Sequence, residues 1–275
     1  MAVRGSSRRG LTRVSFDEVD FHLHTMERPS RDNIPLHELV RECERRGLRC
    51  VCIVDHWKED TDPTIFLRER ELLEQIDSSV KVYLSAEVEI LDEHASSPVS
   101  LEDHKDVIKK LDFLSAAPHL GEFLPDIRRR ELPRSREKFM EYVQEKLLNI
   151  VKSSLFKVIL HPTSYGLGDC VRFGLCERYS MDNVPEEYMD EFVRSVVRYG
   201  KVVQINESTA SNPPEGYDVF IRKMVEGGVK LTVGSDTHYL EDCVRGGYRN
   251  WPGKTRSAVE AIRRCGGDES LLWIP

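Results

Sequence analysis

Short apolar runs alternate with longer segments of helical period along the chain from Val14 onward. Seven of the short runs have the length and the composition of buried strands. The longer segments repeat apolar residues at the three- and four-residue spacing of one helix face. Because no Gly-, Ser- or Pro-rich linker separates the units, the pattern predicts a single domain. The predicted strands are Glu18–His24, Arg49–Asp55, Lys81–Ile90, Leu111–Ala117, Lys157–Leu160, Val202–Asn206 and Lys230–Val233.

Each predicted strand is followed by a segment of helical period. The first helix is expected from the cap Asn33 to Gly47, a residue that suits the left-handed end of a helix. Glycines also close two later helices, at Gly200 and at 227–228, and a final helix is expected over 255–265. Strands that alternate with helices favour a parallel sheet with right-handed crossovers. The prediction is therefore an α/β fold, most economically a seven-stranded (β/α)7 TIM-like barrel.

The composition is that of an ordinary globular chain and excludes two classes of protein. With 47 acidic and 40 basic residues the net charge is -7, so no overall positive field favours a long nucleic-acid duplex, although a local basic groove stays possible. No apolar run approaches the roughly 18–20 residues that span a bilayer. Since the N-terminal stretch has no apolar core, we expect neither a membrane span nor a secretory signal. Residues 1–13 are expected to form a flexible arm, and 14–275 the barrel.

The cysteines predict the compartment. The chain has seven, an odd number without a close pairing pattern. Cys50 and Cys52 lie two apart in an apolar run and are interpreted as packing residues. We therefore expect a reducing compartment, the cytoplasm, and no disulfide bonds.

Six of the nine histidines lie at or just beyond the C-terminal ends of the predicted strands, where barrels of this kind build their sites. A lone histidine in such a place is usually structural, but the constellation favours metal binding. Residues two apart on a strand point the same way, so His22 and His24 can reach one ion, as can Asp236 and His238. The other strand ends carry Asp55 and His56, Glu87 with Glu89 on the same face, His119, and His161.

These residues are too many ligands for a single four-coordinate ion. Six histidines, one glutamate and one aspartate suggest two or three divalent metals joined by a bridging carboxylate. The remaining histidines, His37, His94 and His104, fall in helical or loop contexts and are interpreted as solvated or packing residues.

The ordered motifs resemble the PHP (polymerase and histidinol phosphatase) family. They are DFHLHT (20–25), VDHW (54–57), SAEVEI (85–90), SAAPH (115–119), ILHP (159–162) and VGSDTH (233–238). Ser85 stands where the family often has Gly, a small change for a small residue. The resemblance covers nearly the whole chain beyond the arm. It implies a distorted seven-stranded barrel with a trinuclear cluster, usually of zinc, manganese or iron, that hydrolyses phosphate esters.

The same resemblance implies three groups of metal ligands. The third group needs a residue from the loop after the first strand, which is longer here than usual; Asp32 is the candidate and Glu27 the rival. The implied groups are His22, His24, Glu87 and Asp236 for the first metal, His119 and His161 with the bridging Glu87 for the second, and His56 and His238 with Asp32 for the third.

Metal-assisted hydrolysis needs no serine or cysteine nucleophile, because cations a few ångströms apart lower the pKa of a bridging water and neutralise charge on the phosphoryl oxygens. The proton donor to the leaving group stays open. His238 or Asp55 could serve, but Asp55 could equally orient His56 or cap a turn. Asp20 is likewise either a catalytic group or a support behind the ligands.

Substrate contacts are expected from loops at the same end of the barrel. Guanidinium groups suit a phosphate or carboxylate, and Arg128, Arg130 and Arg245 are the candidates. A solvated charged loop is the alternative for most of them.

We expect a phosphatase that acts on a small phosphomonoester, similar to the histidinol-phosphatase branch. A nucleotide or oligonucleotide phosphoesterase or exonuclease, with short nucleic acid as partner, is the second hypothesis, and a non-catalytic metal-binding regulator the third. An amidohydrolase also opens with His-x-His, but its barrel normally has eight strands and often a metal-bridging Lys after the fourth. Here that strand ends in Ala-Ala-Pro-His.

Overall fold

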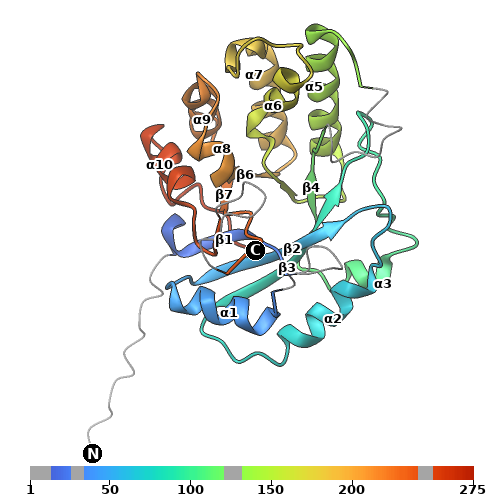
Figure 1. Ribbon diagram of the computed structural model, residues 1–275, viewed down its shortest axis with the longest axis vertical. Coiled ribbons are helices and arrows are strands. Elements are labelled where there is room, and N and C mark those ends of the chain that lie inside the picture. Colours follow the sequence, from blue (N-terminus) through green and yellow to red (C-terminus); the bar gives the residue numbers. More distant parts are fainter. Residues whose placement is uncertain (1–13, 26–33, 121–131, 241–249) are drawn as a thin grey trace, which may run out of the picture.

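A closed ring of parallel strands forms the centre of the molecule (Figure 1). The computed structural model describes residues 14–25, 34–120, 132–240 and 250–275. Its seven strands follow one another in sequence order, and every neighbouring pair is parallel. The first and last strands also meet: His24 N donates to Thr237 O (3.0 Å) and Thr237 N donates to His22 O (3.2 Å). The predicted seven-stranded (β/α)7 barrel is confirmed.

All seven predicted strands occur; four are shorter than predicted, and the largest difference is at the fourth, which begins four residues later than predicted. The chain over 111–114 forms no strand, because the Asp112 side chain takes part in its contact with Leu84 of β3: Asp112 N donates to Leu84 O (2.8 Å), and Leu84 N donates to Asp112 Oδ2 (2.7 Å). Fewer residues are therefore paired on this side of the barrel than between the second and third strands. The strands are β1 (Val19–Leu23), β2 (Cys50–Trp57), β3 (Lys81–Glu89), β4 (Ser115–Ala117), β5 (Val158–Ile159), β6 (Val202–Asn206) and β7 (Lys230–Gly234).

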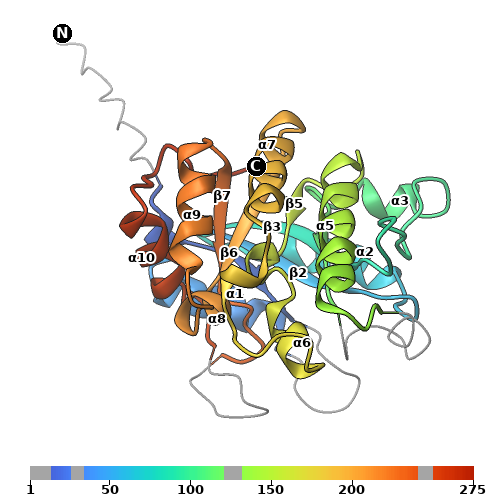
Figure 2. The same ribbon diagram turned by 90° about the horizontal axis from the view of Figure 1, so that it is seen from above.

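Helices cover the barrel on both sides (Figures 1 and 2). The α1 and α2 helices lie against β2 and β3, and α5, α7, α9 and α10 cover the opposite side. They are α1 (Leu36–Arg45), α2 (Thr64–Leu73), α3 (Lys105–Ile108), α5 (Arg136–Lys152), α6 (Leu167–Arg172), α7 (Glu186–Arg198), α8 (Glu207–Ser211), α9 (Tyr217–Glu226) and α10 (Arg256–Arg264), with short 3-10 turns at Phe16–Glu18, Pro162–Ser164 and Met181–Asn183.

The helices end at the glycines that the sequence predicts. Gly47 and Gly200 have the expected positive φ, 76° and 61°, just beyond α1 and α7. The first helix begins after Pro35, and the predicted cap Asn33 lies outside the described residues.

One cysteine expectation is wrong. Cys170 and Cys176 form a disulfide bond, with their Cα atoms 5.4 Å apart. The two residues meet because α6 ends and the chain turns back through Gly174, so that the backbone N–H of Cys176 donates to Cys170 O (3.2 Å). Cys50 and Cys52 are free and buried, as their interpretation as packing residues requires.

No helix among the described residues is long and apolar enough to cross a membrane. The predicted N-terminal arm, 1–13, lies outside those residues, so the division of the chain into arm and barrel stays a prediction.

Candidate metal centre

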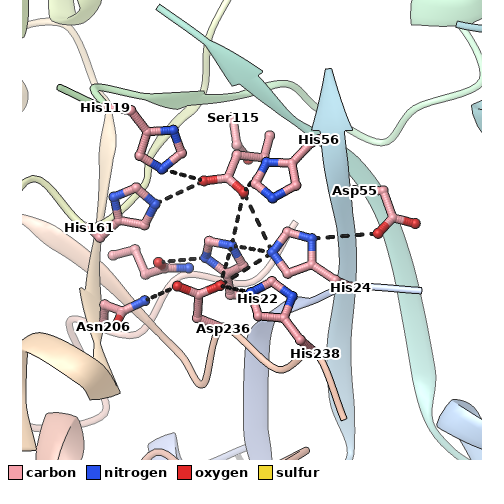
Figure 3. A network of polar contacts seen from close by, with 12 residues as sticks. His22, His24, Asp55, His56, Ser115, His119, His161, Asn206, Asp236 and His238 are labelled. Carbon is pink, nitrogen blue, oxygen red and sulfur yellow. Dashed lines mark hydrogen bonds and ion pairs between the residues drawn. The ribbon is translucent and has the colours of Figure 1, made fainter. Parts of the chain in front are cut away.

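The C-terminal ends of the strands bring the predicted ligand side chains to one end of the barrel, where their imidazoles and carboxylates point toward one another (Figure 3). Parallel strands place these ends side by side, and alternation along each strand turns residues two apart to the same face. The residues that meet are His22, His24, His56, Glu87, His119, His161, Asp236 and His238.

Glu87 lies at the centre of this cluster with its side chain 2% exposed. One carboxylate oxygen, Oε1, is 2.9 Å from His161 Nε2 and 3.4 Å from His119 Nε2. The two imidazoles stack with their centroids 4.8 Å apart. Glu87 and this pair therefore present three ligand atoms to one small volume.

The second oxygen of Glu87 faces the other side of the cluster. Oε2 is 3.1 Å from His56 Nδ1, 3.4 Å from His22 Nε2 and 3.5 Å from His24 Nε2. It accepts no hydrogen bond from any residue that the structure describes. A buried carboxylate oxygen normally accepts a hydrogen bond. This oxygen accepts none although three imidazole nitrogens surround it, and such an arrangement fits a cation.

Asp236 closes the cluster from the end of β7. Its Oδ1 lies 3.3 Å from His24 Nε2, 3.3 Å from His238 Nε2 and 3.6 Å from His22 Nε2. The backbone at Asp236 is left-handed, with φ 59°, and His161 has φ 33°. Non-glycine residues adopt this region at a cost, and they concentrate at functional sites.

Three sets of side chains, each with its ligand atoms within 4.8 Å of one another, have the spacing of an ion site: His22, His24 and Glu87; His24, Asp236 and His238; and Glu87, His119 and His161. Two sets correspond to the first and second groups that the family resemblance implies. The third group differs, because His56 lies against Glu87, and its ring is 6.5 Å from that of His238. Asp32 and Glu27 lie outside the described residues, so that ligand stays a prediction.

The carboxylates and imidazoles of the cluster stabilise each other's charged forms. Burial opposes ionisation of Glu87, but the His56 and His22 imidazoles outweigh it and hold the pKa of this carboxyl well below its usual range. His22 and His238 do the same for the pKa of Asp236, whose side chain is 20% exposed. Burial would lower the pKa of His22, yet the Asp236 and Glu87 carboxylates raise it to about 9. Anionic carboxylates that attract protons onto imidazoles attract divalent cations to the same place.

Gln204 fixes the orientation of His22, and the sequence analysis missed it. Its Oε1 lies 2.9 Å from His22 Nδ1, while its Nε2 donates to Phe21 O (3.3 Å). An amide oxygen only accepts, so His22 Nδ1 carries a hydrogen, and Nε2 is the ring nitrogen that faces the cluster. The only signal in the sequence is a polar residue between the apolar residues of β6.

Glu89 acts on His119 in the same way, with its Oε2 3.0 Å from His119 Nδ1. Sequence alternation places Glu89 on the face of Glu87 but does not show which histidine it contacts. Lys146 supports this histidine from α5, since its Nζ donates to His119 O (2.6 Å), and burial lowers the pKa of Lys146 to about 8.

The two aspartates whose roles stayed open lie in supporting positions. Asp55 Oδ1 is 3.5 Å from His24 Nδ1 and accepts the backbone N–H of Thr25 (2.8 Å). Asp20 accepts backbone N–H groups from His22 (3.2 Å), Ser235 (2.9 Å) and Gly253 (2.8 Å), and thereby joins β1 to the chain beyond β7. Burial raises the pKa of Asp20 to about 6 against the opposing effect of these hydrogen bonds. The proposed phosphate-binding residues Arg128, Arg130 and Arg245 lie outside the described residues.

Known proteins resemble the chain in sequence and in fold. No family model matches it. A probable phosphatase from Thermoanaerobacter sp. (strain X514) is 25% identical over 263 residues, 92% of this chain and 89% of the relative. A probable phosphatase from Caldanaerobacter subterraneus subsp. tengcongensis is 26% identical over 233 residues, 82% of this chain and 78% of the relative.

Two solved structures share the barrel. The histidinol phosphate phosphatase from Lactococcus lactis, complexed with zinc, L-histidinol and phosphate, gives a TM-score of 0.58 at 17% identity over 91% of this chain and 94% of that one. A protein assigned as a histidinol phosphatase from Listeria monocytogenes gives 0.61 at 16% identity over 83% and 98%. At such identities the likeness establishes the fold.

Fold, cluster and relatives agree on one class of protein, a metal-dependent hydrolase of phosphoric esters. The resemblance to the PHP family that the motifs predict agrees with relatives that are named probable phosphatases, and the barrel is shared with two histidinol phosphatase structures.

Replacing Glu87 by Gln should abolish metal loading. The amide keeps the shape of the side chain but removes the negative charge that the surrounding imidazoles require. Elemental analysis of the purified protein measures bound metal. The control is His94→Gln, whose side chain is 77% exposed outside the cluster and which should load metal like the wild type. Wild-type metal content in Glu87→Gln would refute the cluster.

Replacing Gly234 by Ala should weaken metal binding and lower stability. A Cβ at this position would lie 2.5 Å from His22 Cβ and 2.6 Å from Gln204 Nε2. Either residue must shift, at a cost of about 1–3 kcal/mol. Thermal unfolding and zinc titration measure the two effects. Gly168→Ala is the matched control, since a Cβ there meets no atom within 4 Å, and equal behaviour of the two variants would contradict the prediction.

Proposed function

We propose that this chain hydrolyses a small phosphate monoester with two or three divalent metal ions held by the cluster around Glu87. The observation that carries the proposal is a buried carboxylate oxygen with three imidazole nitrogens at 3.1–3.5 Å and no hydrogen bond from the described residues. Imidazoles and carboxylates together suit zinc, iron or manganese. When bound, such ions supply an activated water and neutralise the phosphoryl oxygens.

The side chains of the chain itself hold and orient the reactants. Gln204 and Glu89 keep Nε2 of His22 and of His119 directed inward, so that these nitrogens do not rotate away from the centre. His238 is better placed than Asp55 to donate a proton to the leaving group, because its side chain is 11% exposed and that of Asp55 only 1%. Arg128, Arg130 and Arg245 stay the proposed phosphate contacts.

The space beside the cluster favours a small leaving group. A pocket of about 110 Å³ borders His119 and His161, and Val143, Lys146 and Leu147 of α5 form one wall. Its volume admits a group of a few heavy atoms, and its wall is mainly apolar with one buried ammonium. These features support a monoester of a small alcohol.

The nucleotide or oligonucleotide hypothesis needs exposed aromatic side chains on which bases can stack. Tyr165, which follows the fifth strand, is 1% exposed, and its hydroxyl donates to Gln144 Oε1 (2.9 Å). Trp251 contacts the cations of Arg46 and Lys254, at 5.8 Å and 4.9 Å from the ring centroid. The second hypothesis therefore depends on Trp251 more than on Tyr165. A non-catalytic regulator would be expected to have lost ligands, and the eight ligand residues that come together among the described ones speak against this hypothesis.

We propose the cytoplasm as the compartment. The free and buried thiols of Cys43, Cys50, Cys52 and Cys265 support this proposal, and the Cys170–Cys176 disulfide bond speaks against it.

Release of inorganic phosphate tests the proposed reaction. The purified chain, reconstituted with zinc or manganese, is assayed with histidinol phosphate, sugar phosphates, nucleotides and short oligonucleotides, and Glu87→Gln serves as the blank. We expect selective release from one small monoester. Cleavage of oligonucleotides alone would favour the second hypothesis, and no release from metal-loaded protein would favour the non-catalytic one.

Narrowing the pocket should change substrate choice more than metal content. Val143→Phe extends a side chain into the pocket, so kcat/KM for the preferred ester should fall by about 10–200-fold, while bound zinc stays at the wild-type level. Val197→Phe on α7 is the control, because Val197 is 48% exposed and does not line the pocket. An unchanged kcat/KM in Val143→Phe would exclude the pocket as the leaving-group site.

A further inference from the structure

Two buried carboxyl groups share one hydroxyl behind the metal cluster. Asp55 at the end of β2 and Glu69 in the middle of α2 are 1% and 3% exposed. Both lie at Thr25, the residue after His24: Thr25 Oγ1 is in hydrogen-bond contact with Asp55 Oδ2 and is 3.1 Å from Glu69 Oε1. Neither Glu69 nor Thr25 is among the ligands of the cluster.

The number of protons in this contact is limited. A hydroxyl has one hydrogen to donate, so Thr25 Oγ1 can donate to only one of the two carboxyl groups. The other contact is a hydrogen bond only if a carboxyl oxygen carries a proton and donates it. Two ionised carboxylates buried side by side would also repel each other in a site of low dielectric. One of the two groups must therefore be protonated.

The surroundings place the proton on Glu69. Asp55 accepts the Thr25 N–H (2.8 Å) and lies 3.5 Å from His24 Nδ1, and both neighbours stabilise its charge. Glu69 Oε2 has no hydrogen-bond partner among the described residues. Burial and the neighbouring Asp55 carboxylate raise the pKa of Glu69 to about 11, in agreement with this geometry.

We propose that Glu69 is a positioning residue that stays protonated. It donates its proton to Thr25 Oγ1, the Thr25 hydroxyl donates to Asp55 Oδ2, and this chain of hydrogen bonds keeps the Asp55 carboxylate directed at His24. With Nδ1 of His24 beside Asp55, its Nε2 lies 3.3 Å from Asp236 Oδ1 and 3.5 Å from Glu87 Oε2. His24 belongs to two of the three ligand sets, so one neutral carboxyl on α2 influences both. The effect on metal binding rests on the function proposed above.

Carbon NMR of the carboxyl groups tests the proton in the full-length, metal-free chain. The resonance of Glu69 is identified by its loss in Glu69→Gln. We expect the chemical shift of a protonated carboxyl and no titration between about pH 5 and about pH 9. A midpoint near the ordinary glutamate value of about 4.3 would overturn the proposal.

Zinc affinity, measured by competition with a chelator, tests the positioning role. Glu69→Gln keeps a neutral donor and should keep the wild-type affinity, whereas Glu69→Leu should weaken it by about 10–100-fold. The control is Phe66→Leu, which removes a buried ring from the same helix and should lower the thermal midpoint without changing zinc affinity.

Two results would overturn the positioning role: wild-type zinc affinity in Glu69→Leu, or equal losses in Glu69→Gln and Glu69→Leu. Neither measurement uses a phosphate ester. A chain that binds zinc as expected and releases no phosphate would therefore refute the proposed reaction and leave the role of Glu69 intact.

Discussion

The negative charge of Glu87, buried at one end of the barrel, is the constraint on which the site depends. An isolated carboxylate in this place would be neutralised, because burial disfavours its charged form. Five imidazoles within 3.5 Å prevent this, and they come from four different strands or the residues just beyond them. The cluster therefore exists only when the strands are assembled in order, and it joins the first strand to the last through His22 and Asp236.

Most of the barrel and the ligand residue types could be predicted from the sequence because they follow from local rules. Alternation along a strand places His24 with His22, and the common direction of parallel strands places His119 beside His161. Contacts between distant segments leave no such pattern. Gln204 meets His22 across 182 positions of sequence, and its polar character inside β6 does not name its partner.

Which neighbour each side chain contacts was harder to predict than which residues form the site. Asp55 precedes His56 in the chain but contacts His24, since alternation turns neighbouring side chains on β2 to opposite faces. The same alternation turns the His56 side chain toward Glu87, its partner in the pairing of β2 with β3. Its ring centroid lies 6.5 Å from that of His238, with which the third ligand group had placed it. The disulfide between Cys170 and Cys176 depends on the turn after α6, which spacing alone does not reveal.

The unequal lengths of the strands have a consequence for exchange with solvent. Eight residue pairs join β2 to β3, but only two join β4 to β5. Local opening of a protein begins where few backbone hydrogen bonds must break, so amide hydrogens exchange fastest in such a part of a sheet. His119 and His161 stand just beyond these two strands, whereas His22 and Glu87 stand on longer ones and His24 directly follows one. Since β5 also shares only two residue pairs with β6, we expect the barrel to open first around β5, and the cluster to lose the support of His119 and His161 before that of His22 and Glu87.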